Sequence, residues 1–249
     1  MKTIISRFQR VAIINITIVF ALSAIILTGW LFYASPVKNL FPGNQLSNPV
    51  TSLCFLLACV SLICLVNTRK QLRTIGKMLA VVVLLIGLIK FSEVLFNYTT
   101  GIDKWLFTNK LALNSNAGKP NFMAPNTAMS FFILGGSLLL FRYKINKKNL
   151  LSDYFASAVG LISMTSLLGY AYQSMEFYHA KKYIPMALPT ALSFFLISTA
   201  ILLRRSEFGF FSLFTTRYEG SRTARFLIPF AVIIPITTGL LRLYGEQIG

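Results

Sequence analysis

Residues 124–132 read APNTAMSFF and open the fourth of seven long apolar stretches in the chain. The same pattern opens two further stretches, because residues 48–56 read NPVTSLCFL and residues 187–195 read ALPTALSFF. Proline is tolerated in the first turn of a helix, where no backbone hydrogen bond is lost. Thr or Asn beside it is suited to capping the free N–H groups of that turn. Each pattern therefore predicts the start of a helix.

A helix needs about 20 mainly apolar residues to cross a bilayer. Seven stretches have this character: 11–33, 49–66, 77–97, 123–141, 154–173, 184–203 and 226–244. The 249 residues are 55% hydrophobic and 12% charged, and that charged share is about half of what is usual in a soluble protein. This composition excludes a disordered chain and a disulfide-stapled mini-protein. It predicts an all-α, polytopic membrane protein with seven transmembrane helices, forming one domain over residues 1–249.

The basic residues predict the orientation of these helices. Of the 24 Lys and Arg residues, 16 fall in the N-terminal segment and in the segments 67–77, 142–153 and 204–225, and seven fall on the opposite side. The positive-inside rule then predicts a cytoplasmic N-terminus. The net charge of +17 becomes a cytoplasmic collar that faces anionic lipid headgroups, and we expect no nucleic acid partner.

The repeated pattern also predicts the organisation of the domain. Each patterned stretch follows another apolar stretch that ends in aromatic residues, and each precedes a basic cluster. We therefore expect helical hairpins at 11–66, 77–141 and 154–203 and a half-repeat at 226–244. The missing partner of that half-repeat leads us to expect an eighth helix beyond residue 249.

Lys90 and Glu93 lie inside the third stretch, three residues apart, so they share one face of the predicted helix and can form an intramembrane ion pair. Ionisable residues at this depth usually face the interior of a bundle. One interpretation is a structural pair or a Lys90 side chain that extends to the interface, and the other is a ligand site. Further candidates for that ligand site belong to the same outer layer by topology: Thr51, Tyr98, Asp103, Asn126, Thr127, Tyr170, Tyr172 and Thr190. For the threonines and Asn126, capping of the helix starts is the alternative interpretation.

The sequence carries no nucleotide, zinc-protease or nucleophile motif. With seven acidic residues and one histidine in the chain, we predict no metal site, no cofactor and no catalytic residue.

Four segments, taken in order, resemble the N-terminal membrane region of bacterial sensor histidine kinases and diguanylate cyclases: 92–107, 123–135, 186–196 and 227–247. In this resemblance Glu93 and Asp103 match the two acidic positions of the family, and Asn126, Thr127 and Thr190 match its helix starts. Lys90 departs from the family, which has an apolar or small residue there.

The resemblance implies a signal-input domain in the bacterial inner membrane that detects a small ligand or a membrane property. The full-length protein would carry a cytoplasmic kinase or cyclase domain, absent from this chain, and would form a homodimer. A transporter built from hairpin repeats is the main alternative. A membrane enzyme is a weaker one, because its catalytic residues are hard to assemble from this composition.

Overall fold

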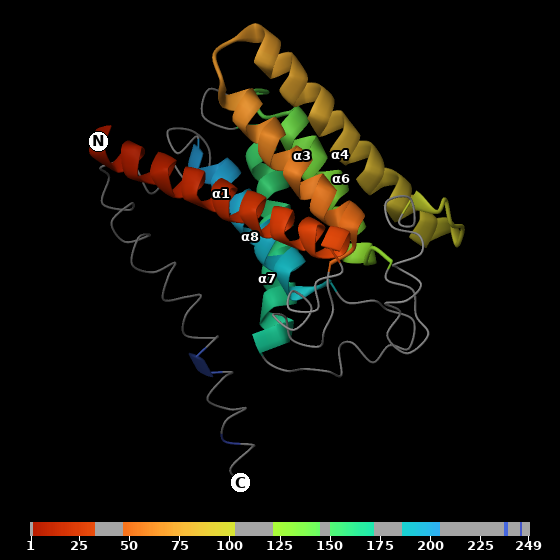
Figure 1. Cartoon of the computed structure of the whole chain (residues 1–249). Helices are drawn as coiled ribbons and strands as arrows, with labels where there is room; N and C mark the ends of the chain where they lie inside the picture. The colour runs from red at the N-terminus through yellow and green to blue at the C-terminus, as the bar shows by residue number, and fades with distance from the viewer. Residues whose placement is uncertain are drawn as a thin grey trace.

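The computed structural model describes residues 2–32, 47–102, 122–144, 150–171 and 186–204, together with Thr237, Thr238 and Gly245. The first five ranges hold six helices (Figure 1): α1 (Lys2–Phe32), α3 (Pro49–Val66), α4 (Lys70–Phe96), α6 (Pro125–Leu139), α7 (Leu151–Ala171) and α8 (Leu188–Arg204). No strand occurs within these ranges, and one isolated bridge joins Lys144 to Leu150. The described part of the chain is therefore all-helical, as the sequence predicts.

Four helices in the described ranges are long and apolar enough to cross a membrane: α3, α4, and the segments Arg7–Phe32 of α1 and Leu151–Tyr170 of α7. The other two are shorter than the predicted stretches 123–141 and 184–203, with 15 residues in α6 and 17 in α8. Proline explains the late start of α6, because Pro125 lacks an N–H and Ala124 before it is extended. The predicted stretch 226–244 lies outside the described residues, apart from Thr237 and Thr238. Four such helices indicate a membrane protein.

By their contacts, the six helices form an inner group of three and an outer group of three. The inner helices α3, α6 and α8 contact one another. Each outer helix contacts two inner ones: α1 contacts α8 and α3, α4 contacts α3 and α6, and α7 contacts α6 and α8. The contact between α1 and α8 closes this ring, and there Asn15 Nδ2 donates a hydrogen bond of 2.9 Å to Thr199 Oγ1.

Burial follows the same division. In the α3 span 61% of the residues are buried, whereas the spans of α1, α4 and α7 are only 28–33% buried. The exposed residues of α4 include Met78, Val82, Leu85 and Leu88, so its outer face is apolar. A face of this kind suits contact with lipid hydrocarbon.

Three phenylalanines form the centre of the inner group. Phe55 of α3, Phe131 of α6 and Phe194 of α8 contact one another, with ring centroids 4.6–4.8 Å apart and interplanar angles of 59–62°. All three side chains are fully buried. These tilted and edge-to-face geometries are the ones that aromatic pairs favour. We call these residues the Phe triad.

Two glycines bring α4 and α6 unusually close together. A Cβ atom at Gly135 of α6 would lie 2.6 Å from Leu84 Cα of α4, and a Cβ at Gly87 of α4 would collide with the backbone of Phe132. Only residues without a side chain fit at these two points. The α4–α6 interface is therefore a backbone-to-backbone contact.

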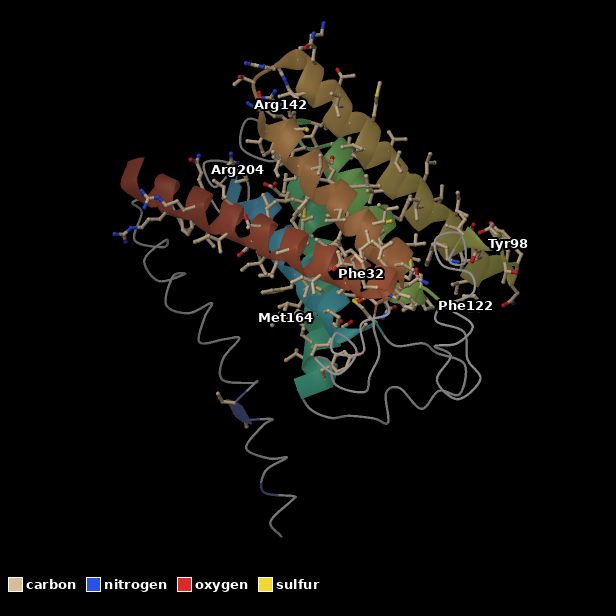
Figure 2. The ribbon with its side chains drawn as sticks, in the orientation of Figure 1. Phe32, Tyr98, Phe122, Arg142, Met164 and Arg204 are labelled. Carbon is tan, nitrogen blue, oxygen red and sulfur yellow. The ribbon has the colours of Figure 1, made fainter. Side chains whose placement is uncertain are left out.

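The bundle has two chemically different ends. The proline end, where α3, α6 and α8 begin, carries Pro49, Pro125 and Pro189. At the basic end α4 and α7 begin and the inner helices finish, and Figure 2 shows Arg142 and Arg204 there, away from Tyr98 and Phe122.

Candidate functional site

Lys90 and Glu93 lie on the single buried stripe of α4, which faces the interior of the bundle. This stripe consists of Gly76, Ala80, Val83, Gly87, Lys90 and Glu93. The exposed fraction is 5% for Lys90 and 9% for Glu93. The Lys90 ammonium forms a salt bridge with Glu93 Oε2. A buried charge is tolerated when it is paired in this way.

The second carboxylate oxygen of Glu93 is bound by the turn that follows α4. Its Oε1 accepts hydrogen bonds from the backbone N–H of Thr100, at 3.0 Å, and from the Thr100 hydroxyl. The turn is possible because Asn97 adopts the left-handed conformation (φ 54°) at the C-cap of α4, a conformation that Asn tolerates better than most residues. Both oxygens of Glu93 are therefore bound, and the carboxylate joins α4 to the segment after it.

Lys90 also faces an aromatic ring from the segment just before α6. Its Nζ lies 6.0 Å from the centroid of the Phe122 ring, at the outer limit for a cation–π contact. Phe122 comes three residues before the first residue of α6. The pair thus lies between the end of α4 and the approach to α6.

The outer helices place uncharged residues where α4 has this pair. When α4 is aligned with α7 at an offset of 76 residues, the buried positions of the two helices match. Gly76 then aligns with Ser152, and Lys90 aligns with Ser166. When α4 is aligned with α1, whose matching residues have numbers lower by 64, Lys90 aligns with the buried Ile26. Glu93 corresponds to a glycine in both helices, Gly29 and Gly169. Among the described outer helices, only α4 has ionisable residues at these two positions.

The predicted threonines form a second group, around the axis of the inner helices. Thr51, Thr127 and Thr190 are buried, and each lies four residues before a member of the Phe triad. Residues four apart share a helix face, so each threonine lies one turn nearer the proline end than its phenylalanine. This group is distinct from the pair on the outer helix α4.

Hydrogen bonds join part of the second group to the end of α1. The Thr190 and Ser47 hydroxyls are 2.7 Å apart, and the Trp30 indole N–H donates to the Ser47 carbonyl at 3.0 Å. In α3 the capping residue is Asn48, whose side chain accepts from Val50 N–H at 2.9 Å. In α6 no side chain caps the first turn.

The antiparallel contact between α4 and α6 places Asn126 near the level of Glu93. Leu84 of α4 contacts Gly135 of α6. Glu93 comes nine residues after Leu84, and Asn126, which is half-buried, comes nine residues before Gly135. Tyr98 is hydrogen-bonded to Ser92, at 2.6 Å, and is 42% exposed.

The other predicted residues lie elsewhere. The Tyr170 hydroxyl donates to the Met186 carbonyl at 2.8 Å, which ties α7 to the chain before α8. Asp103 and Tyr172 lie outside the described residues. The candidates therefore do not form one site: Glu93 is bound by Lys90 and Thr100, and the buried threonines lie around the inner helices.

Sequence reasoning missed Thr100, Phe122 and Ser47. The sequence carried a signal for Thr100, because a hydroxyl seven residues after Glu93, beyond an Asn at the helix end, is within reach of the carboxylate. No comparable signal marks Phe122 or Ser47.

No group of three or more metal-ligating side chains occurs within the described ranges. The carboxylate of Glu93 and the ammonium of Lys90 neutralise each other, so a charged or dipolar group has to replace one partner to bind. Comparisons of the chain with known protein families, with curated proteins and with solved structures found no match.

Proposed function

We propose that this chain is a membrane-embedded signal-input domain of a bacterial sensor kinase or cyclase. In this proposal it lies in the inner membrane with its N-terminus in the cytoplasm. It detects a small ligand or a membrane property near Glu93 and passes the change to a cytoplasmic output domain. The observation that carries the proposal is the buried Lys90–Glu93 pair, which α4 has at positions where α1 and α7 have uncharged residues.

The proposal includes three hairpin repeats, followed by a half-repeat at 226–244 and an eighth helix in the full-length protein. Two observations support the repeats. The buried positions of α4 and α7 match at an offset of 76 residues, and in each inner helix the member of the Phe triad comes four residues after the threonine. A further parallel links successive units. The Ser61 hydroxyl donates to the Gly76 carbonyl at 2.7 Å, and the Ser137 hydroxyl donates to the Ser152 carbonyl at 2.8 Å.

The proposed mechanism uses the connection of Glu93 to two partners. A ligand or a change of lipid environment that competes for Lys90 or Glu93 weakens the hold of Glu93 on Thr100. The packing energy between α4 and α6 then changes, and the bundle shifts between two arrangements of its helices. Because α4 runs to the basic end, a shift of this helix carries the signal across the membrane.

The Phe triad favours this function over a transporter. A transport pathway along the bundle axis needs polar groups at mid-depth, whereas fully buried aromatic rings fill the centre of the inner helices. Substrate uptake into proteoliposomes that depends on Glu93 would favour the transporter instead.

The test is a chimera in which residues 1–249, followed by one added transmembrane helix, precede a histidine kinase domain. We expect Glu93→Gln and Lys90→Met to change basal autophosphorylation at least about threefold, because each breaks the pair. Ser166→Ala is the matched control, since Ser166 occupies the position of Lys90 in α7 and its hydroxyl bonds only within its own helix, to the Ile162 carbonyl. Equal activity of all variants, with equal membrane insertion, would contradict the proposal.

A further inference from the structure

An aromatic side chain joins the end of α1, and likewise the end of α7, to the chain before an inner helix. The Trp30 indole N–H of α1 donates to the Ser47 carbonyl at 3.0 Å, and the Tyr170 hydroxyl of α7 donates to the Met186 carbonyl at 2.8 Å. Each carbonyl lies two residues before the first residue of an inner helix, α3 or α8. At the offsets of 64 and 76 residues the matching residue of α4 is Val94, whose side chain has no donor for such a bond.

The surface of α4 is exposed at this position, directly beside the ion pair. Val94 follows Glu93 in the chain and is 43% exposed, whereas Trp30 is 3% exposed. Leu95 is exposed as well, and so is Tyr98 at this end of the bundle (Figure 2). Tyrosine is typical of the level of lipid headgroups. The ion pair therefore lies next to an exposed small side chain, where α1 has a buried aromatic ring.

The charges of the pair restrict what can bind between Lys90 and Glu93. A lone cation that binds Glu93 would separate the Lys90 ammonium from its carboxylate. A lone anion that binds Lys90 would separate the Glu93 carboxylate from its ammonium. In both cases a buried charge loses its partner, which costs far more free energy than exchanging one partner for another. A molecule with both charges avoids this cost, because each of its groups pairs with one of the two residues.

The surroundings of Glu93 suit a primary ammonium group. The carboxylate already accepts a hydrogen bond from one, that of Lys90, and a primary ammonium has three donors. The Phe122 ring centroid lies 6.0 Å from the Lys90 Nζ, and the face of an aromatic ring attracts cations. The backbone N–H and the hydroxyl of Thr100 bind the second carboxylate oxygen, which orients the first oxygen toward an incoming ammonium.

We propose that Lys90 and Glu93 bind a zwitterion that carries a primary ammonium and a phosphate. Its ammonium replaces that of Lys90 on Glu93, beside the Phe122 ring, and its phosphate pairs with the displaced Lys90. The headgroup of phosphatidylethanolamine and the same headgroup free in water share this chemistry. This inference rests on the proposed function, because it names the chemical class of the ligand at the same site.

The first experiment measures lipid binding by the full chain without any output domain. Native mass spectrometry of detergent-extracted protein would compare the retention of phosphatidylethanolamine, phosphatidylcholine and phosphatidylglycerol with the same acyl chains. Phosphatidylcholine has no N–H donor for Glu93, and phosphatidylglycerol has no cation. We expect phosphatidylethanolamine to bind about tenfold more tightly than either, since one hydrogen bond to a charged group accounts for a factor of this size.

A competition experiment distinguishes the two sources of the headgroup. Displacement of phosphatidylethanolamine by millimolar phosphoethanolamine would identify the free headgroup as a sufficient ligand. Retention of the lipid under these conditions would identify the lipid itself as the ligand.

Two tryptophan variants separate access to the ion pair from the fold. Val94→Trp gives α4 the ring that α1 has at Trp30 and leaves Lys90 and Glu93 unchanged. We expect it to lower phosphatidylethanolamine affinity about tenfold or more, because the ring keeps the headgroup from its hydrogen bonds, and to leave the unfolding temperature unchanged or higher. Leu95→Trp is the matched control. It adds the same ring at a residue that is 60% exposed, and we expect less than about a twofold change, as for contacts at the edge of a site.

Three results would overturn the proposal. The first is equal retention of the three lipids. The second is an equal loss of affinity in the two tryptophan variants, which would indicate a general change of the surface. The third is unchanged phosphatidylethanolamine affinity in a folded Glu93→Gln variant.

The kinase chimera distinguishes failure of this inference from failure of the proposed function. A chimera that responds to Glu93→Gln, in a protein without preference for phosphatidylethanolamine, would overturn the ligand class and leave the proposed function standing. A preference for this lipid together with an unresponsive chimera would support the binding site and contradict its role in signalling.

Discussion

The carboxylate of Glu93 is held at both of its oxygens. It is nearly buried, one oxygen pairs with Lys90, and the other accepts two hydrogen bonds from Thr100. Removing water from such a pair costs free energy that the pair only partly recovers, whereas removing one partner leaves an uncompensated buried charge. The free energy of unfolding should therefore fall much more when one residue of the pair is replaced than when both are.

Lys90→Met should lower the free energy of unfolding by about 3–5 kcal/mol, the usual cost of breaking one side of a buried pair. The double variant Lys90→Met/Glu93→Gln should lose less free energy of unfolding than Lys90→Met alone, because no isolated charge remains. Unfolding in detergent micelles, followed by circular dichroism during titration with dodecyl sulfate, measures both values. Additive losses in the two single variants and the double variant would show that Lys90 and Glu93 do not interact.

Residue spacing accounts for what the sequence could predict of this site. A separation of three residues indicated that Lys90 and Glu93 share one face of the helix. The partners from other segments were not predictable, because Thr100 depends on the left-handed turn at Asn97 and Phe122 depends on the packing of α6. The ligand role of the other candidates stays a prediction.

At the scale of elements, the α4–α6 pair illustrates how small residues set helix distance. A Cβ atom at Gly87 or Gly135 would collide with the backbone of the opposite helix, whereas a Cβ atom at Gly136, one residue further, would meet only the Phe155 ring of α7. Hydropathy gave no reason to distinguish Gly135 from Gly136. The helix starts, in contrast, followed from the Pro and Thr pattern, although α6 and α8 are shorter than predicted.

Gly135→Ala should destabilise the protein by about 1–3 kcal/mol, because the new methyl group overlaps Leu84 and forces α4 and α6 apart. Gly136→Ala is the matched control. Its methyl group would meet Phe155 at 3.7 Å, an ordinary contact, and alanine favours a helix by up to about 1 kcal/mol over glycine. The same dodecyl sulfate titration should therefore give opposite signs for the two neighbours, and equal effects would refute the close contact.

At the largest scale, the helices that the structure describes comprise three inner ones around one aromatic centre and three outer ones that each contact two of them. Each member of the Phe triad contacts the other two at nearly the same distance. The sequence showed the repeated pattern but not its arrangement in space, because apolar runs of similar hydropathy can associate in many ways. The convergence of Phe55, Phe131 and Phe194 required the structure.

Phe55→Ala, Phe131→Ala and Phe194→Ala should each lower the free energy of unfolding by about 3–5 kcal/mol, the usual range for a buried phenylalanine. The three losses should agree within about 1 kcal/mol, because the environments are nearly equivalent, and double variants should lose less than the sum of the singles. Fully additive losses would mean that the rings do not share a contact.

The hydrogen bond between Asn15 and Thr199 has a consequence for biosynthesis. These residues are 184 positions apart in the chain, and ribosomes add about 5–20 residues per second. For roughly 10 to 40 s after α1 emerges, its amide has no Thr199 to bind, at a depth where lipid supplies no substitute. The newly made α1 must therefore be sheltered by the insertion machinery or by neighbouring helices until α8 arrives, so the ring closes only late in synthesis.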